Sequence, residues 1–156
     1  MLIRSATRDD VPALGRLGAQ LMRQHHAFDA RRFLAPGDAP EAGYGRFLGS
    51  QIDDPDVFLH VADVDGCVVG YVYAGIEPLS WKELRDECGF VHDLLVEESA
   101  RGKGAGLALL EAAAAWFSSR AMPRVMLWTA SQNATAQRLF ARAGFRPTMI
   151  EMTREL

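Results

Sequence analysis

The sequence predicts a single α+β domain over residues 1–156, with helices on both faces of one mixed β-sheet. Residues 56–78 read as two β-rich runs around Asp65-Gly66, which is a strong signal for an antiparallel hairpin. Later in the chain, two apolar runs flank a glycine-rich loop and an alanine-rich run. That order predicts two neighbouring parallel strands joined by a right-handed helical crossover. With 156 residues, 49% of them hydrophobic, the chain is long enough to bury one core.

The N-terminal part of the chain predicts a strand and then a helix. Residues 2–6 alternate weakly between apolar and polar side chains and predict a short strand. Residues 7–26 predict a helix, because Thr7 can cap its start and Pro12 is tolerated in a first turn. The apolar stripe of this helix consists of Val11, Leu14, Leu17, Leu21 and Met22.

The middle of the chain predicts irregular segments between regular elements. Prolines and glycines indicate an irregular loop over residues 28–43, and we expect a short helix around residues 45–53. After the hairpin, residues 78–87 are expected to form an excursion between strands. Residues 89–96 are mostly apolar and predict a strand that is buried on both faces.

The last third of the chain predicts two more helices and two more strands. In order, these are a helix over 105–120, a buried strand over 124–130, a helix over 133–145 and a closing strand over 145–156. Pro123 ends the first helix and Gly144 ends the second. The side chains expected to face inward are Leu107, Leu110, Ala114 and Phe117 on the first helix, and Ala136, Leu139, Phe140 and Ala143 on the second.

Charge and cysteine content exclude several classes of protein. The net charge of −3 gives no electrostatic footprint for coating DNA or RNA, so we expect no nucleic-acid partner. No apolar run approaches the length of a membrane span, and the N-terminus has no signal-peptide core. The two cysteines, Cys67 and Cys88, make no disulfide framework. We therefore expect a soluble cytoplasmic protein with no membrane partner.

The stretch 99–106, "SARGKGAG", has the physical properties of an anion site. Its three glycines let a ligand approach the backbone closely, and the N-terminus of the following helix presents free N–H groups and a positive dipole end. A Walker loop is excluded because Glu97 and Gly104 stand where glycine and Ser or Thr are required. A dinucleotide fingerprint fails as well, because its third glycine is absent. The alternative is a strand-to-helix turn with two solvated cations.

The motif "RGKGAG" resembles the Gln/Arg-x-x-Gly-x-Gly/Ala signature of the GNAT acetyltransferases, through Arg101, Gly104 and Gly106. The strand ending in "LLV", the strand "VMLWTA" and the segment "N-x-x-A-x-x-L-F-x-x-x-G-F" fit the same superfamily in order and spacing. The resemblance implies a mostly antiparallel sheet with one splayed parallel strand pair. It also implies acetyl-CoA as the acetyl donor.

The resemblance implies which residues hold the donor. The pyrophosphate would lie on the glycine-rich loop, and the pantetheine arm would pair with the backbone of the central strand. Asn133 matches a position that often contacts this arm, although capping of the last helix explains it equally well. The implied cofactor-binding residues are Leu94, Leu95, Val96, Arg101, Gly102, Lys103, Gly104, Ala105, Gly106, Asn133, Ala136 and Phe140.

Two residues on the central strand are candidates for the catalytic base. A primary amine has a pKa of about 10 and must lose a proton before it attacks a thioester. Several members of the resembled family carry an acidic or histidine base at this level, which points to His92, with Asp93 second. The period of a strand places these side chains on opposite faces of the sheet. The alternative is that both are polar core residues with satisfied hydrogen bonds.

Phe140 departs from the family pattern, because many relatives carry a tyrosine there that protonates the leaving thiolate. A thiol has a pKa of about 8.5, so a thiolate leaves without full protonation and activity is still expected. Water, Ser131 or Thr135 could take over the acid role. A catalytically weak CoA-binding sensor is the alternative that Phe140 motivates.

The acceptor is expected to be a small primary amine resembling an aminoglycoside or a polyamine. The alternative acceptor is a protein N-terminus or lysine. The residues expected to meet the substrate are Phe28, Glu77, Trp81 and Glu87, whose acidic and aromatic groups suit a cationic amine. The alternative is that the acidic residues are solvated charges of the loops. No metal site is expected, because His25-His26 has no further ligand at a suitable spacing. Self-association through exposed strands is common in the resembled superfamily, so a homodimer stays open.

Overall fold

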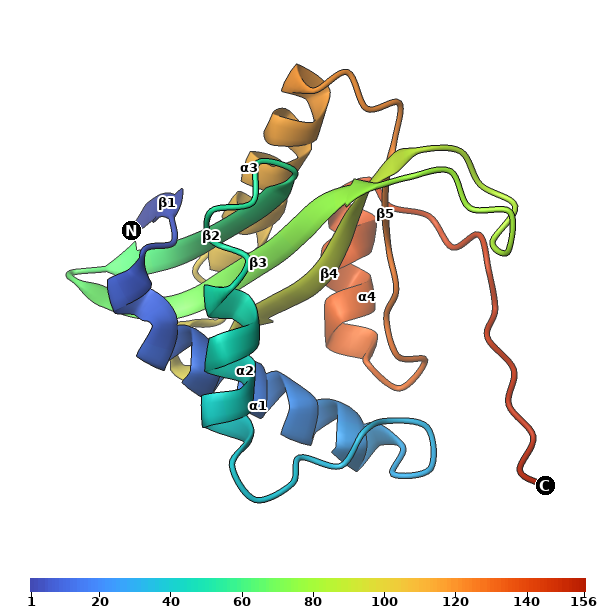
Figure 1. The fold of residues 1–156 in the computed structure, drawn as a ribbon, viewed down its shortest axis with the longest axis horizontal. Helices are drawn as coiled ribbons and strands as arrows, with labels where there is room; N and C mark the ends of the chain where they lie inside the picture. Colours follow the sequence, from blue (N-terminus) through green and yellow to red (C-terminus); the bar gives the residue numbers. More distant parts are fainter.

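The computed structural model describes residues 1–156 and contains one five-stranded sheet in the order β1-β2-β3-β4-β5. The strands are β1 (Leu2–Ser5), β2 (Val57–Val64), β3 (Cys67–Glu77), β4 (Cys88–Val96) and β5 (Val125–Leu127). The pairs from β1 to β4 are antiparallel, whereas β4 and β5 are parallel (Figure 1). The predicted mixed, mostly antiparallel sheet is confirmed.

Helices cover both faces of the sheet, as predicted (Figure 1). They are α1 (Val11–Phe28), α2 (Pro40–Gly49), α3 (Ala105–Ser119) and α4 (Ala134–Arg142), and two short 3-10 helices occupy Arg8–Asp10 and Glu98–Ala100. Because strand side chains alternate, β2 sends Phe58 toward α3 and Leu59 toward α1. No helix is long and apolar enough to cross a membrane.

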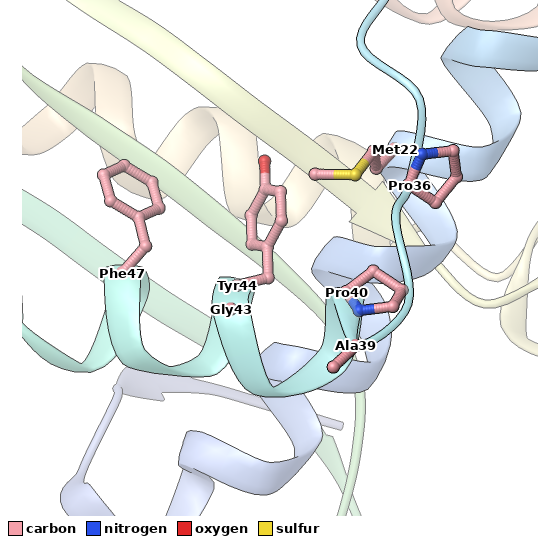
Figure 2. A pocket seen from close by; sticks show the side chains of 7 residues that line it. All are labelled: Met22, Pro36, Ala39, Pro40, Gly43, Tyr44 and Phe47. Carbon is pink, nitrogen blue, oxygen red and sulfur yellow. The ribbon is translucent and has the colours of Figure 1, made fainter.

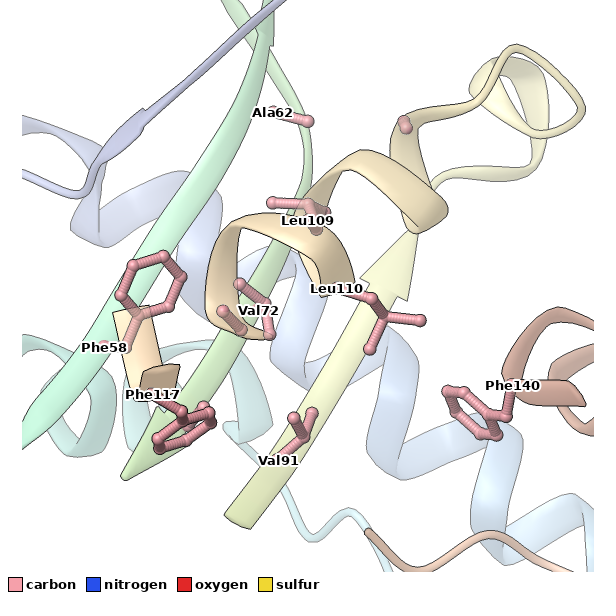
Figure 3. Packing of buried hydrophobic residues seen from close by; sticks show 11 residues of the cluster. Phe58, Ala62, Val72, Val91, Leu109, Leu110, Phe117 and Phe140 are labelled. Atoms are coloured by element: carbon pink, nitrogen blue, oxygen red, sulfur yellow. The ribbon is translucent and has the colours of Figure 1, made fainter. Parts of the chain in front are cut away.

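One core cluster lies between the sheet and the helices α3 and α4. Phe117 and Leu109 of α3 pack over β2 and β3, and Phe140 reaches the cluster from α4 on the other side of β4 (Figure 3). The other cluster joins α1 and α2 to the opposite face through side chains such as Leu14, Leu17 and Leu48. The sheet therefore separates the α1–α2 side from the α3–α4 side.

The hairpin and the crossover are confirmed where local signals predicted them. Asp65 and Gly66 both have positive φ, 53° and 84°, and the Asp63 carboxylate accepts a hydrogen bond of 2.8 Å from the Gly66 N–H. Asp and Gly tolerate a positive φ, which explains why this dipeptide forms the turn between β2 and β3. The glycine-rich loop leads from β4 into α3, and α3 returns to β5.

Two helices differ in detail from the prediction. The second helix is α2, which starts at Pro40 and ends at Gly49 rather than covering 45–53, because proline fits a first turn. On α3 the buried residues include Leu109 and Ala113, whereas the predicted Leu107 is 36% exposed and Ala114 is only half-buried. Alanines surround this helix on all sides, so the apolar pattern did not define its inner face.

The predicted closing strand over 145–156 is wrong, because no strand forms after α4. The edge strand β5 is only three residues long, so it offers little backbone to pair with, and Pro147 lacks an N–H. Instead, the carboxylate of Glu151 accepts hydrogen bonds from Arg32. The predicted strand over 124–130 is also shorter than expected, and Trp128 beyond its end is 68% exposed.

Candidate active site

The parallel strands β4 and β5 separate part-way along β4. Their pairing ends at Val91 opposite Leu127, although β4 continues to Val96. Beyond Val91, β4 is paired with β3 along one edge only, and the chain after β5 leads to α4 (Figure 1). A strand edge with free backbone groups can pair with an extended ligand. The splayed pair expected from the sequence is therefore present.

A β-bulge in β4 lies at the point where the strands separate. Tyr73 of β3 pairs with Asp93 and Ala74 pairs with Val91, so His92 is the extra residue. A bulge breaks the alternation of side chains. As a result, His92 contacts the Tyr73 ring and Asp93 contacts the Tyr71 hydroxyl, and both side chains face the α1–α2 side. The prediction that they lie on opposite faces is wrong, because it assumed a strict period of two.

His92 is held by an acid and by two aromatic rings. Its Nε2 lies 3.1 Å from Oε1 of Glu77, and its ring centroid lies 4.9 Å from that of Tyr73 and 5.1 Å from that of Phe90. Burial lowers the pKa of the imidazole, and the nearby Glu77 and Asp93 charges partly oppose this effect. At neutral pH the ring is therefore mostly uncharged, and its Nδ1 has no hydrogen-bond partner in the protein.

Asp93 accepts hydrogen bonds from two tyrosines on one oxygen. The hydroxyls of Tyr44 and Tyr71 lie 2.8 Å and 3.0 Å from its Oδ2. Burial raises the pKa of Asp93, and the two hydroxyls lower it in part. Burial also raises the pKa of both tyrosines, so they stay protonated donors. Asp93 thus ties α2 and β3 to the bulge.

The glycine-rich loop presents a run of unpaired backbone N–H groups. No N–H from Gly102 to Leu107 has an acceptor in the protein, and the first backbone bond into α3 comes from Ala108 to Gly104. Gly102 and Gly104 adopt φ values of 76° and 87°, and an added Cβ would meet nothing at either position. The glycines are therefore required by backbone conformation, and the N–H groups point to an anion.

The two cations of the loop are anchored by the strand and the turn before it. Arg101 donates from Nε to the Val96 carbonyl at 3.0 Å, and Lys103 donates to the Ser99 carbonyl at 3.2 Å. Gly106 has a different role, since an added Cβ would lie 2.9 Å from a methyl group of Leu139. It lets α3 pack closely against α4.

The predicted residues on α4 have structural partners of their own. Asn133 caps α4, with Oδ1 accepting a hydrogen bond of 3.1 Å from the Ala136 N–H, so the capping interpretation is confirmed. Ala136 packs against the core cluster between the sheet and the helices α3 and α4. Phe140 is 9% exposed and lies beside Phe145. Leu94 and Val96 also pack against that cluster, while Leu95 belongs to the α1 side.

Of the predicted substrate residues, the structure brings Glu77 to His92. Trp81 is 84% exposed in the 78–87 excursion, and Glu87 is exposed just before β4. No hydrogen bond, ion pair or ring contact joins either of them to His92. The ring centroid of Phe28 lies 5.8 Å from that of His25, near the end of α1.

A pocket of about 340 Å³ opens beside Tyr44. Met22 of α1 and the Tyr44 and Phe47 rings of α2 face it, and the chain before α2 closes one side (Figure 2). Its lining residues are Met22, Pro36, Ala39, Pro40, Gly43, Tyr44 and Phe47. The α1–α2 crossing is tight here, because a Cβ on Gly18 would lie 2.0 Å from the Tyr44 ring. The Tyr44 ring thus lines the pocket while its hydroxyl reaches Asp93.

Sequence reasoning missed Tyr44, Tyr71 and Tyr73. Tyr71 and Tyr73 share one face of β3, and their hydroxyls are the only polar side-chain groups between Val68 and Ile76. This pattern could have predicted them as site residues. Tyr44 gave no local signal, because its partner is 49 residues away in the chain.

The family model of the Acetyltransferase (GNAT) family matches residues 20–145. The chain belongs to the GNAT family. A curated relative, an uncharacterized N-acetyltransferase of Archaeoglobus fulgidus, is 29% identical over 94% of this chain and 93% of its own length. The mycothiol acetyltransferase of Acidothermus cellulolyticus is 31% identical over 77% of this chain, which spans 40% of that longer protein.

Solved structures share the fold of this GNAT protein. A mutant protein of Bacillus halodurans superposes with a TM-score of 0.85 at 22% identity, over 100% of this chain and 99% of that one. An aminoglycoside 6'-N-acetyltransferase of Acinetobacter haemolyticus superposes with a TM-score of 0.74 at 16% identity, over 100% and 99%. At these identities the likeness shows the fold alone.

Membership makes the chain an acyltransferase of a family that generally uses acetyl-CoA as acetyl donor. The residues present fit that donor. The unpaired N–H groups of Gly102–Leu107 suit a pyrophosphate, and the free edge of β4 suits an amide-containing arm. No group of three or more His, Cys, Asp or Glu side chains is placed to hold a metal ion.

Proposed function

We propose that this GNAT protein moves the acetyl group of acetyl-CoA to the primary amine of a small molecule by direct attack on the thioester. One observation carries the proposal. The bulge places the uncharged imidazole of His92, backed by Glu77, where β4 loses its partner strand. A base held by an acid at an open strand edge is suited to proton removal beside a bound acyl group.

The donor would be held by backbone rather than by side chains. The N–H groups from Gly102 to Leu107 would bind its pyrophosphate, with Arg101 and Lys103 adding positive charge. The backbone of Leu94, Leu95 and Val96 would pair with its extended arm. When bound, acetyl-CoA supplies an acetyl group activated as a thioester.

His92 would accept the proton of the attacking amine. With Nε2–H donated to Glu77, the lone pair of Nδ1 is free, and Glu77 stabilises the imidazolium that forms. The lowered pKa of His92 keeps the ring uncharged at neutral pH, so it is ready to act as a base. Asp93 is the second candidate, but its Oδ2 already accepts two hydroxyls. We therefore assign it to positioning.

The oxyanion of the transition state would be met by the main chain of the bulge. His92 is exposed as a residue although only 29% of its side chain is exposed, so part of that exposure belongs to its main chain. Preorganised N–H donors at such a position stabilise developing negative charge. Phe140 cannot protonate the leaving thiolate, and water or a hydroxyl such as that of Ser131 or Thr135 would do so.

A small acceptor is supported by the size of the pocket beside Tyr44, whose hydroxyl reaches Asp93, and by the names of relatives. The pocket beside Tyr44 has about 340 Å³, which fits a small molecule. Two relatives are named as acetyltransferases of mycothiol and of aminoglycosides, both small molecules. We propose that the chain forms one catalytic domain and acts in the cytoplasm. That it forms a homodimer stays a prediction.

The proposal is tested by thiol release from acetyl-CoA over a panel of small amines, a peptide N-terminus and a lysine peptide. We expect release with at least one small amine, and a loss of about 10²-fold or more in kcat for His92→Ala. Preference for the peptides would favour the protein-acetylating alternative. Binding of CoA without turnover of any amine would favour the sensor and contradict the proposal.

A further inference from the structure

A row of five aromatic rings runs through the site. In order it consists of Phe47 of α2, Tyr73 of β3, His92 and Phe90 of β4, and Trp128 just after β5. Successive ring centroids are 5.6 Å, 4.9 Å, 5.1 Å and 5.2 Å apart. The row connects the pocket beside Tyr44 to the place where β4 and β5 separate.

The ends of this aromatic row are exposed, which core packing does not explain. Phe47 is 45% exposed and Trp128 is 68% exposed, whereas Phe90 is buried. Phe47 stands next to Tyr44 on α2 and faces the same pocket (Figure 2). Large exposed rings on either side of a reactive group are typical of a ligand-binding surface.

The charge beside the row is negative, and one partly exposed carboxylate, that of Glu77, contacts the row directly. Burial and the charges of Asp93, Glu77 and Asp54 raise the pKa of Tyr73, so the row lies in a negative field. Glu77 is 34% exposed in its side chain, and its Oε2 lies 3.9 Å from Nη2 of Arg85. Asp54 is exposed but forms no ion pair or hydrogen bond with the row, and Asp93 is occupied by two tyrosine hydroxyls. Little free negative charge therefore touches the row, which suits one ammonium group better than the several of a polyamine or an aminoglycoside.

Building on the proposed acetyltransferase activity, we propose that the acceptor is a primary amine linked to a flat aromatic ring. The ring stacks against the exposed part of the aromatic row, and the amine lies beside His92, within the field of the Glu77 carboxylate. Ring pairs at centroid distances of about 4.5–7 Å attract one another beyond the effect of buried area. The row thus selects the acceptor by its ring, while Glu77 selects its charge.

The test compares acceptors that differ only in their π-system. Thiol release is measured with 2-phenylethylamine, 2-cyclohexylethylamine, propylamine, spermidine and kanamycin. We expect kcat/KM for 2-phenylethylamine to exceed that for 2-cyclohexylethylamine about three- to tenfold, and to exceed those for spermidine and kanamycin. Equal or reversed values would overturn this inference alone. No release with any of the amines would overturn the proposed function as well.

Variants locate the effect on the row. At least one of Phe47→Leu and Trp128→Leu, which lie at opposite ends of the row, should lower the preference for the phenyl over the cyclohexyl amine. Circular dichroism shows whether each variant keeps its fold. Leu84→Ala is the matched control, because Leu84 is 87% exposed and lies outside the row. A preference unchanged in both row variants, or lost in the Leu84 variant, would overturn the assignment.

Discussion

Nε2 of His92 lies 3.1 Å from Oε1 of Glu77, and this contact joins the bulge of β4 to the last residue of β3. The carboxylate fixes the ring and opposes the fall in the pKa of His92 that burial causes. A base that is oriented by an acid loses both orientation and basicity when the acid is removed.

Glu77→Gln should therefore lower kcat and shift the pH profile. We expect kcat/KM to fall about 10- to 100-fold. The acidic limb of the profile should move to lower pH, because removing the negative charge lowers the pKa of His92 further. The measurement is kcat/KM against pH with one amine. An acidic limb that stays in place, or moves to higher pH, would show that Glu77 does not act on the base.

Gly104→Ala should weaken CoA binding. At φ 87° a Cβ is strained, which costs about 1–2 kcal/mol, and relaxation would turn the N–H groups of the loop away from the anion. Gly66→Ala is the matched control, since Gly66 has φ 84° in the β2–β3 turn. We expect both variants to lose similar stability in denaturant titrations. Only Gly104→Ala should raise the Kd for CoA in calorimetry, and an equal Kd in both would contradict the loop assignment.

The hairpin and the glycine-rich loop could be predicted from the sequence because their signals are local. Asp65-Gly66 favours its own turn, and glycine readily adopts the positive φ values that the loop requires. The bulge at His92 could not be predicted, since it depends on which residues of β3 pair with β4. The same holds for Tyr44 and Asp93, whose contact depends on how α2 packs across the sheet.

Phe140→Tyr should raise turnover if the side chain faces the leaving thiolate. The new hydroxyl could supply general acid catalysis, which typically contributes about 10²- to 10⁴-fold. The measurement is kcat and the basic limb of its pH profile, with Phe145→Tyr as control because Phe145 lies next to Phe140. An unchanged profile in Phe140→Tyr would mean that no acid is missing at this position.

Asp10→Asn should destabilise the fold in a pH-dependent way. Arg4 donates two hydrogen bonds to the Asp10 carboxylate, at 2.7 Å and 3.0 Å, and these lower its pKa. A lowered pKa in the folded state stabilises the fold above the unfolded value of about 3.9 and ceases to do so as pH falls.

The expected loss in Asp10→Asn is about 2 kcal/mol at pH 7, and it should shrink below about pH 4. Urea unfolding at both pH values measures it. Asp53→Asn is the control, because the Asp53–Arg8 pair is exposed and should contribute less than about 1 kcal/mol. A loss of equal size at both pH values would rule out the ion pair as its cause.

The role of His92 as the base is tested most directly by chemical rescue of His92→Ala. The variant removes a side chain that is 29% exposed at an open site, so a small molecule can replace it. Thiol release from acetyl-CoA is measured with a fixed amine at rising imidazole concentration. We expect release to fall about 10²-fold or more without imidazole and to recover with saturation as imidazole is added. Undiminished release by His92→Ala would contradict the assignment of His92 as the base.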